Sequence, residues 1–270
     1  MKKVILKLFS FYIKSSIHVA FSVVSLALIS LRVAHCEPTA NLLIFIFCCA
    51  LFAYNFVKFF PVVMEKKNEN FYNPIFVLSL VCLLISLYLF INFSLLTKII
   101  LIIGGALVLF YTLPINNNFS NLRNVKGWKV YLVVATWILL TVGVPLVSNS
   151  VFEKKLFLQL SIIQGIYVFV AILPFDIRDL SSDSRNLNTP PQQLGISRVK
   201  TLGYILLFLN FIFSVISFGL KSPMTISEFV SFSFLAYLLK KSHPNNPKYY
   251  SSFWVEAIPI FWAGFLYLIL

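Results

Sequence analysis

Apolar residues occur along this chain in long runs that are separated by short polar segments. A helix that spans the hydrocarbon core of a bilayer needs about 20 mainly apolar residues. On that criterion the sequence predicts nine transmembrane helices, at residues 16–34, 41–63, 75–93, 95–114, 128–147, 156–175, 199–219, 224–240 and 253–270. No polar segment is long enough for a separate soluble domain. We therefore expect an all-α polytopic membrane protein with one domain at residues 16–270.

The composition excludes a soluble or a disordered chain. Of the 270 residues, 59% are hydrophobic and 11% are charged, whereas about a quarter of the residues of a soluble domain are charged. The mean hydropathy of +0.89 is too high for disorder. Residues 1–15 mix four lysines with apolar residues and lack a small-residue cleavage site, so they predict an amphipathic segment at the membrane interface.

The formal net charge of +13 is explained by membrane topology, so we expect the lipid bilayer as a partner and no nucleic acid. When the loops are assigned alternately to the two sides of the membrane, 17 of the 22 Lys and Arg residues fall on one side. Basic residues are retained on the cytoplasmic side. The asymmetry therefore predicts a cytoplasmic N-terminus and an outside C-terminus.

Two local patterns mark helix starts. Asn73 precedes Pro74 as an N-cap residue precedes a first-turn proline. The spacing of Thr225 and Glu228 is that of a capping box, which explains Glu228 as a helix-capping residue.

The segment between the sixth and seventh predicted spans contains every aspartate of the chain. Asp176, Asp179 and Asp183 have the spacing i, i+3, i+7, which places three carboxylates on one face of a helix that continues from the sixth span. Local pairing with Arg178 and Arg185 is one explanation, but neither neutralises all three. We favour a divalent cation, because carboxylates and phosphate oxygens are the ligands that Mg²⁺ prefers.

This segment resembles the second aspartate-rich motif of the UbiA-type intramembrane prenyltransferases. The similarity extends to Thr189-Pro, to Leu194-Gly195 and to Tyr111-Thr-Leu-Pro114 at the end of the fourth span. The resemblance implies nine helices around a central cavity that opens to the cytoplasm. It also implies Mg²⁺ at Asp176, Asp179 and Asp183, where the metal assists ionisation of an isoprenyl diphosphate donor. The acceptor would be a quinone, a tetrapyrrole or a lipid, and the location a bacterial cytoplasmic membrane.

The first aspartate-rich motif of that family is degenerate in this chain. The corresponding run is Asn55-Phe-Val-Lys58-Phe, where only the Asn remains and Lys58 takes the place of acidic residues. A lysine is a compact point charge that can pair with phosphate. We therefore expect Lys58 to act with the aspartates in catalysis, and we expect substrate contacts from the residues Asn55, Tyr111, Arg123, Lys126 and Arg178.

Three alternatives remain open. Lys58 can simply extend to the cytoplasmic interface, and the protein can be a non-catalytic relative that binds an isoprenoid or a lipid in the same cavity. A small-molecule transporter would be favoured by inverted repeats or by charges at mid-membrane, and the sequence shows neither. Glu256, near the start of the last span, is the one further carboxylate that could face the cavity, although Trp254 beside it also fits an interfacial belt.

Overall fold

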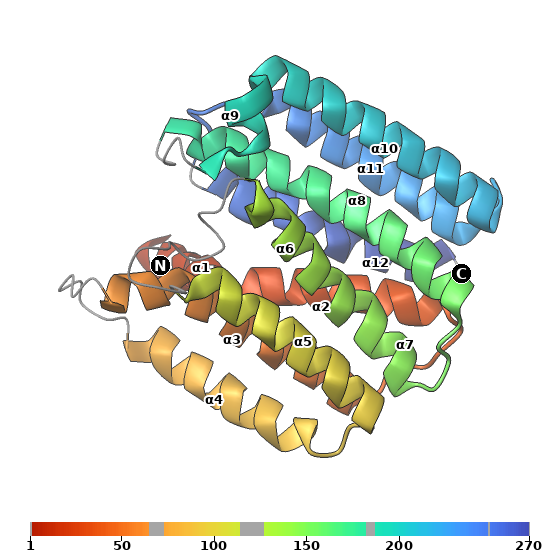
Figure 1. Cartoon of the computed structure of the whole chain (residues 1–270). Coiled ribbons are helices and arrows are strands. Elements are labelled where there is room, and N and C mark those ends of the chain that lie inside the picture. Colours follow the sequence, from red (N-terminus) through yellow and green to blue (C-terminus); the bar gives the residue numbers. More distant parts are fainter. Residues whose placement is uncertain (1, 65–72, 114–126, 182–186, 248, 270) are drawn as a thin grey trace.

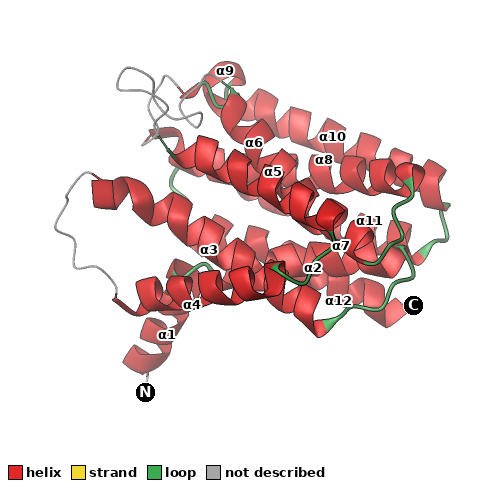
Figure 2. Cartoon of the chain, turned by 60° about the horizontal axis from the view of Figure 1, so that its bottom comes forward, coloured by secondary structure: helices red, strands yellow, loops and turns green. Residues whose placement is uncertain are grey.

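The computed structural model describes residues 2–64, 73–113, 127–181, 187–247 and 249–269. Throughout these residues the only regular secondary structure is helical, as Figure 2 shows. The all-α prediction is therefore confirmed for the described part of the chain.

The helices coincide in position with the nine predicted apolar ranges. Three of them are preceded, interrupted or extended by short π or 3₁₀ segments. In chain order the elements are α1 (Lys2–Lys14), α2 (Ile17–Val33), α3 (Ala40–Met64), α4 (Asn73–Phe90), α5 (Leu95–Thr112), α6 (Trp128–Ile138), the π segment Leu139–Gly143, α7 (Val144–Ser148), α8 (Lys154–Arg178), the 3₁₀ segment Asp179–Ser181, α9 (Pro190–Leu194), α10 (Ile196–Phe218), α11 (Pro223–Lys241), the π segment Tyr250–Val255 and α12 (Glu256–Ile269).

Six of the described helices are long and apolar enough to cross a membrane. They are Ala40–Phe60, Leu95–Thr112, Trp128–Ser148, Lys154–Ser181, Ile196–Phe218 and Tyr250–Ile269. A seventh is reached if α1 and α2, which are bent by 54° at their junction, form one broken span. The chain thus has the helices of a multi-pass membrane protein. The count of nine spans stays a prediction, because α4 is a shorter apolar helix and α11 is not among the six.

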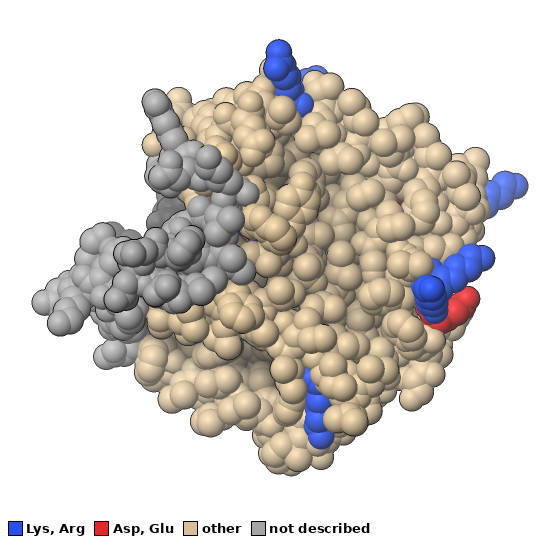
Figure 3. Space-filling model, viewed as in Figure 1, with Lys and Arg blue, Asp and Glu red and all other residues tan. Residues whose placement is uncertain are grey.

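The helices form one bundle with the two chain termini at opposite ends (Figures 1 and 2). We call the end that holds α1 and α9 the α1 end. Large apolar side chains cover the outside of the bundle, for example Tyr88, Phe208 and Ile216, which are between 63% and 78% exposed. On the face shown in Figure 3 charged side chains are few and most of the surface is uncharged, as contact with lipid tails requires.

Two buried clusters form the interior. One lies between α8, α10, α11 and α12 and contains Tyr167, Phe232 and Trp262 in mutual ring contact. The other lies between α2, α3 and α4. Helix α2 contributes Leu26 to the first cluster and Ala27 to the second, so it joins the two halves of the bundle.

A buried glutamine, Gln164, connects three helical segments at the centre of the bundle by hydrogen bonds. The Gln164 amide on α8 donates to the Leu26 carbonyl and to the Ser30 hydroxyl of α2, at 3.0 and 2.9 Å. Its oxygen accepts a hydrogen bond from Thr141, at 2.7 Å, in the π segment between α6 and α7. These bonds hold three helices in a fixed register, because buried polar groups are costly unless they are paired.

The predicted capping box at Thr225 and Glu228 is wrong. Helix α11 begins earlier, with Ser222 as its N-cap and Pro223 in its first turn. Proline has no N–H to lose at that position, so it favours a helix start there. Glu228 is therefore the sixth residue of α11, and its side chain is fully buried.

Candidate functional site

The end of α8 carries the first two predicted metal ligands, and each has a basic partner. Asp176 lies in the last turn and is 1% exposed. One of its oxygens accepts a hydrogen bond from Lys129 at the start of α6, at 2.8 Å. A carboxylate buried this deeply is tolerated because a cation offsets its charge. The sequence did not reveal this pair, because Lys129 is far from Asp176 along the chain and lies on another helix.

Asp179 is paired with its neighbour. The Arg178 guanidinium donates Nε to one carboxylate oxygen of Asp179 at 2.7 Å and Nη2 to the other at 2.9 Å. The same guanidinium lies over the ring of Phe175, 5.3 Å from its centroid. Such a two-bond pair fixes the orientation of both side chains. Local pairing, which the sequence analysis weighed against a divalent cation, is therefore present for Asp179.

The α-helical face that carries Asp176 does not continue beyond Arg178. The α-helix ends at Arg178 and is followed by a 3₁₀ turn at Asp179–Ser181. Serines at this point favour such an ending, because their hydroxyls compete for the backbone hydrogen bonds. Asp183 lies outside the described residues, as do the predicted phosphate contacts Arg123 and Lys126.

Asn55 and Lys58 connect α3 to the bend between α1 and α2. The Asn55 amide donates to the Ser15 carbonyl at 3.0 Å and to the Ser79 hydroxyl at 2.8 Å, and it accepts from Ser16 at 2.8 Å. The Lys58 ammonium donates to the Lys14 carbonyl at 2.8 Å. Asn55 is thus buried in a junction of three helices, whereas Lys58 is exposed.

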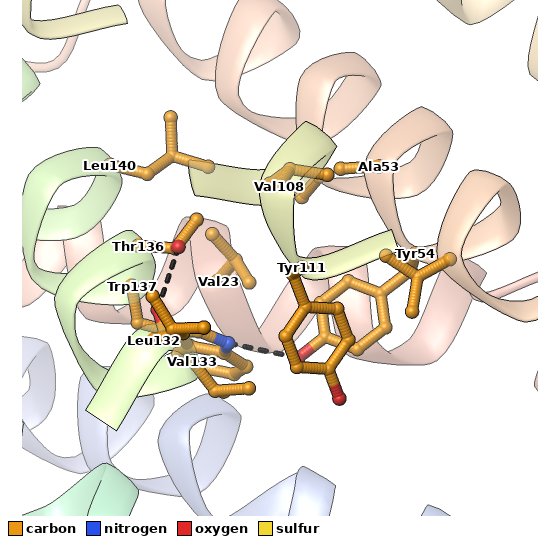
Figure 4. A pocket seen from close by; sticks show the side chains of 12 residues that line it. Val23, Ala53, Tyr54, Val108, Tyr111, Leu132, Val133, Thr136, Trp137 and Leu140 are labelled. Atoms are coloured by element: carbon orange, nitrogen blue, oxygen red, sulfur yellow. Dashed lines mark hydrogen bonds between the residues drawn. The ribbon is translucent and has the colours of Figure 1, made fainter. Parts of the chain in front are cut away.

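An apolar cavity lies next to this junction, between α2, α3, α5 and α6 (Figure 4). Its volume is about 130 Å³, and its wall includes the predicted residue Tyr111. Figure 4 shows the Tyr54 hydroxyl facing Trp137, whose indole N–H donates to it at 2.9 Å. The remaining lining residues are Val23, Ala50, Ala53, Val57, Val108, Leu132, Val133, Thr136 and Leu140.

The cavity and the charged residues are adjacent. Lys58 lies about one helical turn after the lining residue Tyr54 on α3, and Lys129 lies about one helical turn before the lining residues Leu132 and Val133 on α6. An apolar space and two cations therefore occur together at the α1 end of the bundle.

Glu256 is a further charged residue of this region. It begins α12, its side chain is half-buried, and it interacts electrostatically with Lys58 and Arg178. It also acts on Tyr54 in the cavity wall. The sequence placed Glu256 at the membrane edge but left its role open between the cavity and an interfacial position. The structure places it within electrostatic range of Lys58, Arg178 and the lining residue Tyr54, although Glu256 is not itself part of the cavity wall.

The described carboxylates do not fit a magnesium site by themselves. Among the described residues no three side chains of the types His, Cys, Asp and Glu come close enough to hold a metal ion. Asp176 and Asp179 already have cationic partners on separate sides. Mg²⁺ is usually held by one or two carboxylates together with phosphate oxygens, so the predicted ion would depend on Asp183, outside the described residues, or on the phosphates of a bound substrate.

Comparison with family models, with curated proteins and with solved structures finds no match for this chain.

Proposed function

We propose that this protein is an intramembrane prenyltransferase of the UbiA kind, which binds an isoprenyl diphosphate at the α1 end. The isoprenyl group would pass to an apolar acceptor such as a quinone, a tetrapyrrole or a lipid. The observation that carries the proposal is the adjacency of the apolar cavity to Lys58 and Lys129. A ligand with an apolar chain and an anionic head matches that combination of surfaces.

The charge of the α1 end suits a diphosphate. In the predicted topology the cytoplasmic side carries 17 basic residues and six of the nine acidic ones. Arg178 uses two N–H groups on Asp179, and a guanidinium has five N–H donors in all. Donors therefore remain for a phosphate oxygen, for which an arginine is well suited.

The size of the cavity sets which part of a ligand it can take. Its volume of about 130 Å³ is close to the roughly 150 Å³ of an engineered cavity that binds benzene. It can therefore hold about one isoprene unit or one acceptor ring. Tyr54, Tyr111 and Trp137 line it, and the face of an aromatic ring attracts a positive charge that develops beside it.

The proposed reaction moves the isoprenyl group from a diphosphate oxygen to the acceptor. The carbon–oxygen bond to the diphosphate breaks, and both electrons leave with the diphosphate. The acceptor then forms a bond to the allylic carbon and loses a proton. Lys58, Lys129 and Arg178 would offset the charge of the leaving group, and the apolar wall would keep water from the reactive carbon. Mg²⁺ at this end of the bundle stays a prediction.

A second candidate is a non-catalytic protein that binds an isoprenyl diphosphate or a similar lipid. The pairing of Asp176 with Lys129 and of Asp179 with Arg178 favours it. Carboxylates that are held by basic side chains have less capacity to bind the metal that the enzymes of this kind use.

A transfer assay separates the two candidates. Purified protein in nanodiscs receives labelled isoprenyl diphosphates of increasing chain length, a lipid extract as the source of acceptors, and Mg²⁺ or a chelator. The prenyltransferase proposal predicts a labelled apolar product and released diphosphate. Saturable donor binding without product for any donor supports the non-catalytic candidate instead. Absence of both product and binding contradicts both.

A cavity-filling variant tests the apolar half of the site. Ala53→Phe adds a ring inside the cavity wall, so we expect it to abolish transfer and to weaken donor binding, while inorganic diphosphate still competes as before. Val77→Phe is the matched control, because Val77 is 56% exposed on the outer surface of α4. Equal loss of transfer in both variants would point to misfolding and remove the cavity from the proposal.

A further inference from the structure

A second acidic position lies far from the residues discussed above, inside the C-terminal half of the bundle. Glu228 on α11 is 0% exposed. Neither of its carboxylate oxygens makes a hydrogen bond with a residue in the part of the chain that the structure describes. Within the same part of the chain no basic side chain pairs with it. Among the described residues no cation therefore offsets the charge of an ionised Glu228, and only the neutral Ser214 hydroxyl favours it.

Three other buried oxygen-bearing side chains come from the same pair of helices. Helices α10 and α11 pack side by side (Figure 1). Asn210 and Ser214 are one turn apart on α10 and share a face. The Ser214 hydroxyl lies 3.5 Å from the Thr225 hydroxyl of α11, and it also faces the Glu228 carboxyl. Glu228 follows Thr225 by three residues, so it lies at the level of Asn210 and Ser214.

The Asn210 amide is oriented by the neighbouring helix. Its nitrogen donates to the Ile163 carbonyl of α8 at 2.9 Å, whereas its oxygen is buried without a hydrogen bond from a described residue. Three acceptor atoms, two on Glu228 and one on Asn210, are thus buried without a hydrogen bond from a described residue, and the Ser214 hydroxyl is the neutral donor nearest to Glu228 among the groups discussed. A proton on one Glu228 oxygen could be donated to one of the other two acceptors, which leaves one acceptor without a hydrogen bond from a described residue.

The side of the cluster toward α12 is closed. The Trp262 indole N–H donates to the Ser227 hydroxyl, next to Glu228, at 3.2 Å. Apart from Glu228, the charged side chains of the packed helices stand near the helix ends: Lys154, Lys155, Asp176 and Arg178 on α8, Arg198 and Lys200 on α10, Lys240 and Lys241 on α11, and Glu256 on α12. The surroundings of Glu228 are therefore apolar apart from the neutral oxygens.

We propose that Glu228, Asn210, Ser214 and Thr225 form a binding site for one small monovalent cation, for which Na⁺ is the probe. The four side chains offer only oxygen ligands, which hard cations prefer. One carboxylate and one monovalent ion make a neutral pair, whereas a divalent ion would leave a net charge in a low-dielectric interior. The ion would bind the buried oxygens of Glu228 and Asn210 together and would link α10 to α11.

Direct binding tests the site. Purified protein in nanodiscs at alkaline pH is titrated with ²²Na⁺, and its thermal unfolding is followed in sodium chloride and in N-methylglucamine chloride of equal ionic strength. We expect one bound Na⁺ per chain and an unfolding midpoint that rises by several degrees with saturating Na⁺. Glu228→Gln should lose both effects, and Asn210→Leu should weaken binding. Glu37→Gln, at an exposed acid, should retain both.

Absence of ²²Na⁺ binding by the wild type would overturn the proposal, whatever the variants do. Stabilisation by falling pH in place of Na⁺ would show that Glu228 holds a proton only, and that result also overturns it. Retention of the sodium effect in folded Glu228→Gln would place the ion elsewhere. None of these results depends on prenyl transfer.

Discussion

The two acidic regions of this bundle differ in how their charge is offset. At the α1 end Asp176 and Asp179 each have a basic partner within hydrogen-bonding distance, and Glu256 interacts with two cations. Inside the α10–α11 pair Glu228 has only neutral oxygens around it. The first region carries basic residues that an incoming anion can share, whereas the second can accept only a positive charge. The same side-chain type thus indicates opposite ligands in the two regions.

The largest loss of stability is expected when the buried ion pair between Lys129 and Asp176 at the α1 end is broken. Lys129→Met removes a cation from a carboxylate that is 1% exposed, so we expect unfolding free energy to fall by about 3 kcal/mol or more. Equilibrium unfolding in mixed micelles measures the change. The double variant Lys129→Met/Asp176→Leu should recover most of the loss, because no unpaired charge then remains. A single variant as stable as the wild type would show that Lys129 does not offset Asp176.

Removal of the Asn55 amide should lower the unfolding free energy by a somewhat smaller amount. Asn55→Leu leaves the buried hydroxyl of Ser16 and the Ser15 carbonyl without their partner, which should cost about 2 kcal/mol. Asn149→Leu is the control, since that amide bonds only the preceding turn of its own helix. If Asn55→Leu weakens diphosphate binding with no loss of stability, Asn55 contacts the ligand, as the family resemblance implies.

The smallest effect on stability is expected at Asp179, whose side chain is one-third exposed. Asp179→Asn should change the unfolding free energy by about 0.5 kcal/mol, because water screens an exposed pair. Its effect on ligand binding is more informative. As the partner of Arg178, Asp179 competes with an anion, so its neutralisation should strengthen diphosphate binding. Loss of a Mg²⁺-dependent stabilisation in this variant would instead identify Asp179 as a metal ligand.

The helical elements could be predicted well because each depends on a long local apolar run. Every predicted range has its helix, and even the start of α4 at Asn73 follows from the proline beside it. The weakest inference concerned Glu228. Its spacing from Thr225 matched a cap, but Pro223 starts α11 earlier, and whether a residue is capped or buried depends on the helix start.

The contacts of the candidate site were harder to predict, because they join residues distant in sequence. The sequence around Asp176 does not indicate that Lys129 is its partner, and the sequence around Tyr54 does not indicate Trp137. Both pairs depend on how α6 packs against the other helices. Arg178 and Asp179 are neighbours, and this pair could be foreseen from the sequence. The aspartate spacing and the distribution of basic residues indicated a charged end of the bundle, but they did not specify which cation meets which carboxylate.

Equilibrium binding of labelled farnesyl diphosphate to the protein in nanodiscs tests the central claim most directly, with Arg178→Gln and Arg198→Gln compared side by side. Arg198 is an exposed arginine at the start of α10 and serves as the control. We predict saturable binding by the wild type and by Arg198→Gln, competition by inorganic diphosphate, and binding by Arg178→Gln that is weaker by roughly tenfold or more. Absence of saturable binding by the wild type, or equal affinity of all three proteins, would contradict an anion site at the α1 end.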